Sequence, residues 1–205
     1  MLSRRNFIRN TAITTIGFVG LRALANQKML ETVPLGKAGY GPLLNDPKGL
    51  LKLPAGFSYT TFSHMGEKMV DGFLVPGMHD GMASFAGPNG ETLLVRNHEL
   101  ESRFPEKGPY GLKHERLDQL PAGKIYDRGN GVAPNIGGTT TIVFNTETQK
   151  MERHFLSLAG TVRNCAGGPT PWGTWVTCEE VNVLPEPDAE QPHGYNFEVK
   201  PTIEP

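Results

Sequence analysis

Two stretches of alternating side chains, residues 139–144 and 153–158, limit the fold of this chain more narrowly than any other feature. In both, β-branched, aromatic or other apolar residues alternate along the chain, which is the period of a β-strand. The polar residues 145–150 connect the two stretches and are typical of a hairpin connection. We therefore expect an antiparallel β-hairpin.

Further short strands are expected between turns rich in glycine and proline. The chain has 25 glycines and 17 prolines, which favour many turns and leave little room for long helices. Segment 101–138 reads as irregular, with a weak helical pattern only at 113–120. The other expected strands are residues 57–62, 92–96, 172–178 and 194–199. This pattern predicts an all-β fold, and short strands at regular intervals favour the blades of a β-propeller.

The length of the chain bears on how much of a propeller it can form. A blade takes roughly 40–50 residues and a closed ring needs about four or more. No closing strand is recognisable in residues 201–205. We therefore expect residues 26–205 to be the N-terminal blades of a longer protein.

The N-terminus has the features of an export signal. Arg4 and Arg5 precede Phe7, a mildly apolar stretch covers residues 11–21, and Ala23-Leu24-Ala25 is typical of a cleavage site. Residues 1–25 are therefore predicted to be a twin-arginine signal peptide, recognised by the twin-arginine translocon of a bacterium. The apolar stretch is shorter than the roughly 20 residues of a membrane span. This predicts a periplasmic or secreted protein with no stable membrane anchor.

Charge and cysteine content narrow the possible partners. The formal net charge is -1, from 20 basic and 21 acidic residues, which argues against a nucleic-acid partner. The two cysteines are Cys165 and Cys178. In an oxidising compartment they can form one structural disulfide, or one thiolate can bind a metal loaded before export. The sequence leaves both readings open.

Potential metal ligands gather in four clusters, which we expect to be turns: residues 79–82, 96–99, 163–175 and 178–180, with residues 193–194 as a possible fifth. Carboxylate and amide oxygens suit calcium, whereas a thiolate suits iron or zinc. If Glu179 and Glu180 lie on a strand, one of the two points inward and needs a cation or a hydrogen-bond donor. The candidate ligands are Asp80, Asn97, His98, Glu99, Cys165, Glu179 and Glu180.

These motifs resemble a known family. Residues 164–175, Asn-Cys-Ala-Gly-Gly-Pro-Thr-Pro-Trp-Gly-Thr-Trp, together with Thr-Cys-Glu-Glu at 177–180, Arg-Asn-His-Glu at 96–99 and the twin-arginine signal, are similar to the PhoX-type alkaline phosphatases. The resemblance runs from residue 3 to about residue 199. It implies a β-propeller outside the cytoplasm that hydrolyses small phosphomonoesters at a centre of iron and calcium ions.

The resemblance also suggests roles for single residues. Family members hold iron partly through a cysteine thiolate, a role that falls here on Cys165, and acidic ligands of iron and calcium fall on Glu99, Glu179 and Glu180. Asp80, Asn97 and His98 are chosen by their chemistry as much as by the motif. The implied reaction is metal-assisted attack on phosphorus. No serine nucleophile is required.

One departure from the family affects the expected activity. Its members are about twice as long as this chain, and their second half supplies further metal and phosphate contacts. We therefore expect the 205-residue form alone to lack measurable phosphatase activity. Two alternatives remain at this stage: a secreted propeller of the same family that binds a metal or ligand without hydrolysis, and a calcium-dependent lactonase or phytase-like propeller that needs carboxylates only.

Overall fold

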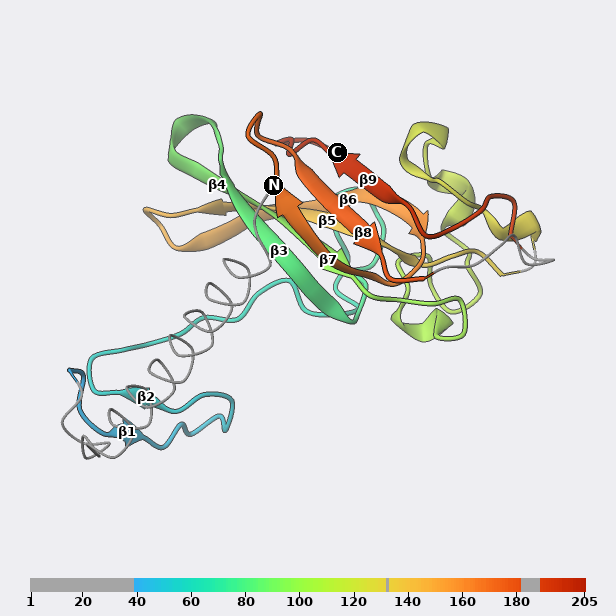
Figure 1. Ribbon diagram of the computed structural model, residues 1–205. Coiled ribbons are helices and arrows are strands. Elements are labelled where there is room, and N and C mark those ends of the chain that lie inside the picture. Colours follow the sequence, from blue (N-terminus) through green and yellow to red (C-terminus); the bar gives the residue numbers. More distant parts are fainter. Residues whose placement is uncertain (1–38, 132, 182–188) are drawn as a thin grey trace, which may run out of the picture. The chain divides into compact units, whose positions relative to one another are not determined.

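A computed structural model describes residues 39–131, 133–181 and 189–205 (Figure 1). The predicted signal peptide, residues 1–25, lies outside these ranges. The chain divides into two compact units, one ending at Thr60 and one from Thr61 to Pro205. The described ranges contain no α-helix and no helix suited to crossing a membrane. Their helical turns are all short 3-10 turns: η1 (Pro88–Gly90), η2 (Pro105–Lys107), η3 (Leu117–Gln119), η4 (Ala122–Lys124) and η5 (Gly129–Gly131).

The first unit, as far as it is described, is a small hairpin. Strands β1 (Leu43–Leu44) and β2 (Leu53–Pro54) pair antiparallel. The carboxylate of Asp46 organises the connection, because it accepts hydrogen bonds from the backbone N–H groups of Lys48 at 3.0 Å and Leu50 at 2.8 Å, and from the hydroxyl of Tyr59.

The prediction of a strand at residues 57–62 is wrong. No strand is assigned to this segment, because its aromatic side chains enter separate contacts and its backbone joins no ladder. The ring of Phe57 packs edge-on against Tyr40 at 5.2 Å in the first unit, whereas in the second unit Phe62 stacks on Phe144 at 5.1 Å. Alternation alone does not make a strand when no partner strand pairs with it.

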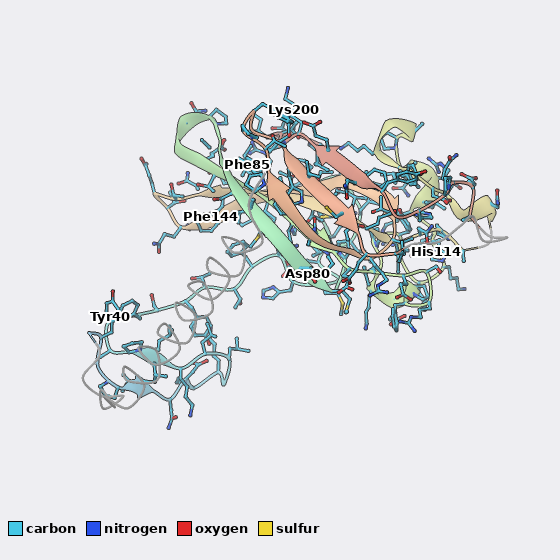
Figure 2. The ribbon with its side chains drawn as sticks, in the orientation of Figure 1. Tyr40, Asp80, Phe85, His114, Phe144 and Lys200 are labelled. Carbon is cyan, nitrogen blue, oxygen red and sulfur yellow. The ribbon has the colours of Figure 1, made fainter. Side chains whose placement is uncertain are left out.

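The second unit begins with a four-stranded antiparallel sheet in chain order. Its strands are β3 (His79–Ala86), β4 (Glu91–His98), β5 (Gly137–Asn145) and β6 (Lys150–Thr161). The predicted hairpin is confirmed as β5 and β6, and the strand predicted at 92–96 is confirmed as part of β4. Strand β3 was expected to start as a turn. It is instead an edge strand, with Asp80 near one end and Phe85 near the other (Figure 2).

A three-stranded antiparallel sheet follows, made of β7 (Asn164–Pro169), β8 (Trp175–Glu179) and β9 (Asn196–Val199). The strands predicted at 172–178 and 194–199 are confirmed with shifted bounds. The glycine-rich start of the 163–175 cluster is strand β7 rather than a turn. Strand β7 lies beside β3 (Figure 1), so the edges of the two sheets meet.

Two apolar clusters hold these sheets in place. Val95, Trp175 and Val199 are buried together between the two sheets. The irregular segment between β4 and β5 folds onto β6 through a second cluster, in which Leu100, Tyr110, Ile136 and Leu156 are at most 1% exposed. Only η3 falls within the weakly helical segment 113–120. Burial of these side chains fixes the ends of β4 and β7, where the candidate ligands lie.

The all-β prediction is confirmed, with three antiparallel sheets. The meander β3-β4-β5-β6 has the strand number and order of a propeller blade. The described ranges do not close into a ring, so the propeller itself stays a prediction.

Candidate metal centre

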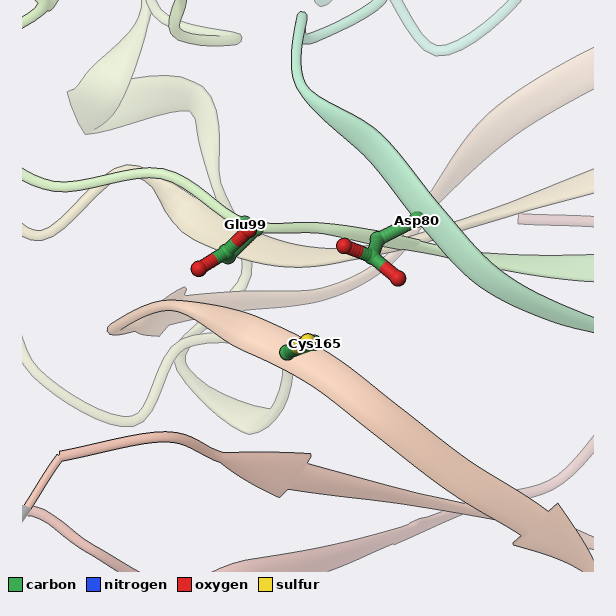
Figure 3. A group of neighbouring side chains, drawn as sticks. All are labelled: Asp80, Glu99 and Cys165. Atoms are coloured by element: carbon green, nitrogen blue, oxygen red, sulfur yellow. The ribbon is translucent and has the colours of Figure 1, made fainter.

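Three of the predicted ligands converge in the second unit. A carboxylate oxygen of Asp80, a carboxylate oxygen of Glu99 and the sulfur of Cys165 all lie within 4.8 Å of one another (Figure 3). They come from different elements: Asp80 from β3, Glu99 from the residue after β4, and Cys165 from β7. Asp80 is exposed, and Glu99 and Cys165 are half-buried. The group is therefore open to solvent on one side.

Two β-bulges place Asp80 and Cys165. In β3, His79 pairs with His98 and Met82 with Arg96, which leaves Asp80 and Gly81 opposite one residue of β4. In β7, Asn164 pairs with Glu179 and Gly167 with Thr177, which leaves Cys165 and its neighbour opposite one residue of β8. A bulge bends its strand and re-aims its side chains. Both ligand candidates thus depart from the regular alternation of their strands.

Gly81 allows the two bulges to approach each other. A Cβ atom at this position would lie 2.7 Å from the carbonyl oxygen of Cys165 and 3.4 Å from the side-chain nitrogen of Asn97. The first distance is too short for a real contact, so any side chain here would push β7 away from β3. The Asp80-Gly81 pair, which resembles an ordinary turn in the sequence, is a point of close strand contact.

The surroundings of Cys165 disfavour its thiolate when no cation is present. Desolvation, followed by the negative charges of Asp80, Glu180 and Glu99, raises the pKa of the thiol above its ordinary value. A metal requires the deprotonated sulfur, so cation binding here would release a proton. Both cysteines are free thiols, and the disulfide reading of Cys165 and Cys178 does not describe this structure.

Arg163 links the carboxylates around this group. Its Nη2 atom lies 3.4 Å from Glu99 Oε1 and 3.3 Å from Glu180 Oε2, and its Nε atom lies 3.6 Å from Glu101 Oε1. Its backbone N–H donates to the carbonyl of Leu100 at 2.9 Å, and its own carbonyl accepts from the N–H of Glu180 at 3.0 Å. Arg163 therefore connects the segment that follows β4 to the segment that follows β8, and it brings Glu180 near Glu99.

Asn97 and His98 lie inside the fold rather than in the group. Asn97 is fully buried and both polar atoms of its side chain bond protein groups. His98 is also fully buried; its Nδ1 donates to the carbonyl of Gly77 and its Nε2 accepts from the hydroxyl of Thr140, both at 2.9 Å. Burial, followed by the charge of Arg96, lowers the pKa of His98 well below its ordinary value. The imidazole is neutral and both its nitrogens are engaged.

Glu179 belongs to a different, buried network. Its carboxylate accepts hydrogen bonds from the backbone N–H groups of Val162 at 2.8 Å, Gly194 at 2.6 Å and Tyr195 at 3.1 Å. It also lies 2.7 Å from Nδ1 of His193, whose Nε2 lies 3.1 Å from Asp127 Oδ2. The structure thus separates Glu179 from Asp80, Glu99 and Cys165, and brings it to His193 and Asp127.

The charges of this buried network support one another. Burial alone would raise the pKa of Glu179, but the hydrogen bonds from His193 and three backbone N–H groups lower it overall. The pKa of Asp127 is lowered in the same way against the effect of burial. For His193, burial lowers the pKa, and the hydrogen bonds and charges of Glu179 and Asp127 outweigh it, so the net shift is upward. The three shifts favour a protonated His193 between two ionised carboxylates, and Nε2 of His193 also lies 2.9 Å from the side-chain nitrogen of Asn135.

Comparison with known protein families identifies the family of the chain that carries this group. The model of the family described as alkaline phosphatase PhoX matches this chain over residues 38–143 and 133–204. The chain belongs to the PhoX family of alkaline phosphatases. The resemblance found in the sequence is thereby confirmed. Neither the comparison with curated proteins nor that with solved structures finds a match.

The donor set of the group fits the metals that the PhoX resemblance implies. A thiolate together with carboxylates is suited to iron or zinc, whereas the oxygens of Asp80, Glu99 and the nearby Glu180 suit calcium. A site on this chain that combines both donor types can therefore distinguish two kinds of cation.

Sequence reasoning overlooked two residues that shape the PhoX chain's sites. Arg163 entered the sequence analysis only as the first residue of the cluster 163–175. A positive charge two residues before Cys165 is a usable signal for a residue that pairs with nearby carboxylates. Asp127 was not considered; its one local signal is Gly129, whose N–H donates to the Asp127 carboxylate at 2.6 Å as in an Asx turn.

Proposed function

We propose that this chain contributes Cys165, Asp80 and Glu99 to the metal centre of a phosphomonoester hydrolase that acts outside the cytoplasm. The observation that carries the proposal is the convergence of a thiol and two carboxylates within 4.8 Å in a chain of the PhoX family. The cofactor is iron with calcium, and the substrate is a small phosphomonoester. The enclosing architecture is a β-propeller, and residues 1–25 direct export through the twin-arginine translocon.

The charges around the group explain why cations are needed. Arg163 contacts Glu99, Glu101 and Glu180, Arg103 also pairs with Glu101, and Asp80 adds a further carboxylate beside Cys165. The four carboxylates outnumber these two arginines, so without cations this surface repels a phosphate dianion. Bound cations supply Lewis acidity to the phosphate and to the attacking water.

Each protein group then has a distinct role. Cys165 provides a sulfur donor, which favours iron or zinc over calcium, whereas Asp80 and Glu99 provide oxygen donors to either kind of cation. Arg163 pairs with Glu99 and Glu180 when no cation is bound, and its N–H donors would be free to pair with phosphate oxygens once cations neutralised these carboxylates. His98 and the Glu179–His193–Asp127 network stay buried and support the strand ends.

Metal analysis of the whole protein that contains this chain, called the full-length gene product below, tests the proposal. The protein is purified from a bacterium that exports it. We expect iron and calcium in the wild-type protein and hydrolysis of p-nitrophenyl phosphate. Cys165→Ser is expected to lose iron and activity together, and the matched control Cys178→Ser to keep both. Metal without turnover favours a family member that binds cations only. Calcium without iron, unaffected by Cys165→Ser, contradicts the thiolate role.

A further inference from the structure

Asn97 connects the two sheets at the bulge that carries Cys165. It lies on β4, is fully buried, and is the residue opposite the Asp80-Gly81 bulge of β3. Its side-chain Nδ2 donates to the carbonyl oxygen of Cys165 at 3.0 Å and to that of Ala166 at 3.1 Å. These are the two residues of the β7 bulge, where the regular ladder of hydrogen bonds is interrupted. The amide therefore fixes the backbone of the bulge from the neighbouring sheet.

The contact with Trp175 identifies the orientation of this amide. Its indole Nε1 donates to Asn97 Oδ1 at 2.9 Å, and Trp175 is 3% exposed. An indole N–H can only donate, so the atom facing it must be the oxygen and the NH2 group must face the two carbonyls. Both hydrogens of the NH2 group and the oxygen are thus used.

No other side chain of this size supplies the same contacts. Aspartate has the same shape but would set a carboxylate oxygen against two carbonyl oxygens, and leucine would leave the carbonyls and the indole N–H without partners in a dry site. Gly81 adds a steric condition, because it leaves just enough room for the Cys165 carbonyl beside β3. Asn97 on β4 therefore holds that carbonyl by a hydrogen bond, and the close approach of Gly81 on β3 limits the space around it.

We propose that Asn97 is the positioning residue of the Cys165 thiol: it holds the bulge of β7 so that the sulfur faces Asp80 and Glu99. The sequence suggested Asn97 as a ligand; the contacts give it a role through the ligand's backbone instead. The inference rests on the proposed function, since the position of the sulfur matters to a cation only if Cys165 binds one.

Cobalt(II) is a suitable probe, because a thiolate bound to cobalt(II) gives a charge-transfer band in the near ultraviolet. The full-length gene product, freed of metal, is titrated with cobalt(II) chloride as wild type, Asn97→Asp and Trp175→Phe. Asn97→Asp keeps the contact to Trp175 but loses the donors to the bulge. We expect it to bind cobalt(II) about 10–100-fold more weakly and to show a weakened or shifted band. Trp175→Phe, which keeps both donors, is expected to retain the band.

The outcomes separate this inference from the proposed function. A wild-type protein without a thiolate band contradicts the metal role of Cys165 and the positioning role with it. A wild-type band that persists unchanged in folded Asn97→Asp, with wild-type affinity, overturns the positioning role alone. If Asn97→Asp loses its near-ultraviolet circular dichroism, it has lost its native packing, and Gly81→Ala is tested instead. The added methyl group of Gly81→Ala displaces the same carbonyl from the side of β3. An unchanged cobalt(II) band in that variant also overturns the inference.

Discussion

Asp80 and Cys165 occupy facing β-bulges on the neighbouring edges of two separate sheets. Each bulge turns a side chain out of the alternation of its strand, and the two side chains meet with Glu99 within 4.8 Å. Edge strands are usually exposed to unwanted pairing, and bulges are a common way to interrupt them. Here the interruption also creates a cluster of donors.

The first prediction concerns the electrostatic effect of Asp80 on the thiol. The Asp80 carboxylate is among the groups that raise the pKa of Cys165, after desolvation, and it also forms a hydrogen bond with the thiol. Asp80→Asn should lower that pKa, and so increase the thiolate fraction at a given pH. In a metal-free Cys178→Ser background, we expect alkylation of Cys165 by iodoacetamide at pH 8 to become severalfold faster. Asp118→Asn, at an exposed residue of η3, should leave the rate unchanged, and an equal acceleration there would contradict the assignment.

The second prediction concerns the competition between Arg163 and a cation. Its guanidinium lies 3.3–3.4 Å from carboxylate oxygens of Glu99 and Glu180 and repels an approaching dication. We expect Arg163→Gln to bind calcium severalfold more tightly at low salt, measured by isothermal titration calorimetry. The gain should shrink as salt screens the charge.

Arg103 offers a matched control for this experiment. It pairs with Glu101 at 2.7 Å, but its side chain is 68% exposed, so its charge is screened by solvent. Arg103→Gln should leave calcium binding nearly unchanged. Weaker binding by Arg163→Gln would show that the arginine arranges the carboxylates rather than competing for them.

The third prediction compares two adjacent glutamates. Glu179 is buried and accepts four hydrogen bonds, whereas the side chain of Glu180 is 61% exposed. Glu179→Gln breaks a buried ion pair and should lower the free energy of unfolding by about 3–5 kcal/mol. Glu180→Gln should change it by less than about 0.5 kcal/mol while weakening calcium binding. Urea denaturation and calorimetry measure both effects; equal destabilisation by the two variants would contradict the division of roles.

The sequence predicts the strands that are rich in β-branched and apolar residues and joined by a polar turn, such as β5 and β6. It misses β3 and β7 because their residues include Gly81, Gly167 and Gly168, which read as turns when taken alone. Their strand conformation depends on pairing with β4 and β8, which is a long-range interaction. Residues 57–62 show the converse, since good local alternation found no partner.

The chemistry of the side chains predicted the candidate ligands. It did not predict that some of them lie in the open group around Cys165 and others in buried networks. The expectation that one of Glu179 and Glu180 points inward is confirmed, because alternation along a strand dictates it. What the inward glutamate meets depends on residues far along the chain: His193 comes from beyond β8 and Asp127 from the segment before β5. In the same way, the bulges that unite Asp80 and Cys165 are invisible in the residue pattern, because a bulge is defined by the register of two strands.

The last prediction concerns the pH dependence that His193 gives to stability. The pKa of His193 is raised in the folded protein, so its contribution is complete below the ordinary histidine value of about 6.5 and disappears as the pH rises through the folded value. The pKa values of Asp127 and Glu179 are lowered, so their contribution is complete above about 4.3 and is lost only in acid. Between these limits the network is fully charged and most stabilising.

His193→Gln removes the cation and leaves Asp127 and Glu179 buried without it. At pH 6 we expect the free energy of unfolding, measured by urea denaturation, to fall by about 3–5 kcal/mol. At pH 9 the deficit should be smaller, because the wild-type histidine is then losing its proton and its own contribution. His64→Gln, at a side chain that is 55% exposed, should show little effect at either pH. A deficit that stays constant from pH 6 to pH 9 would mean that His193 acts through packing and neutral hydrogen bonds, and not through its charge.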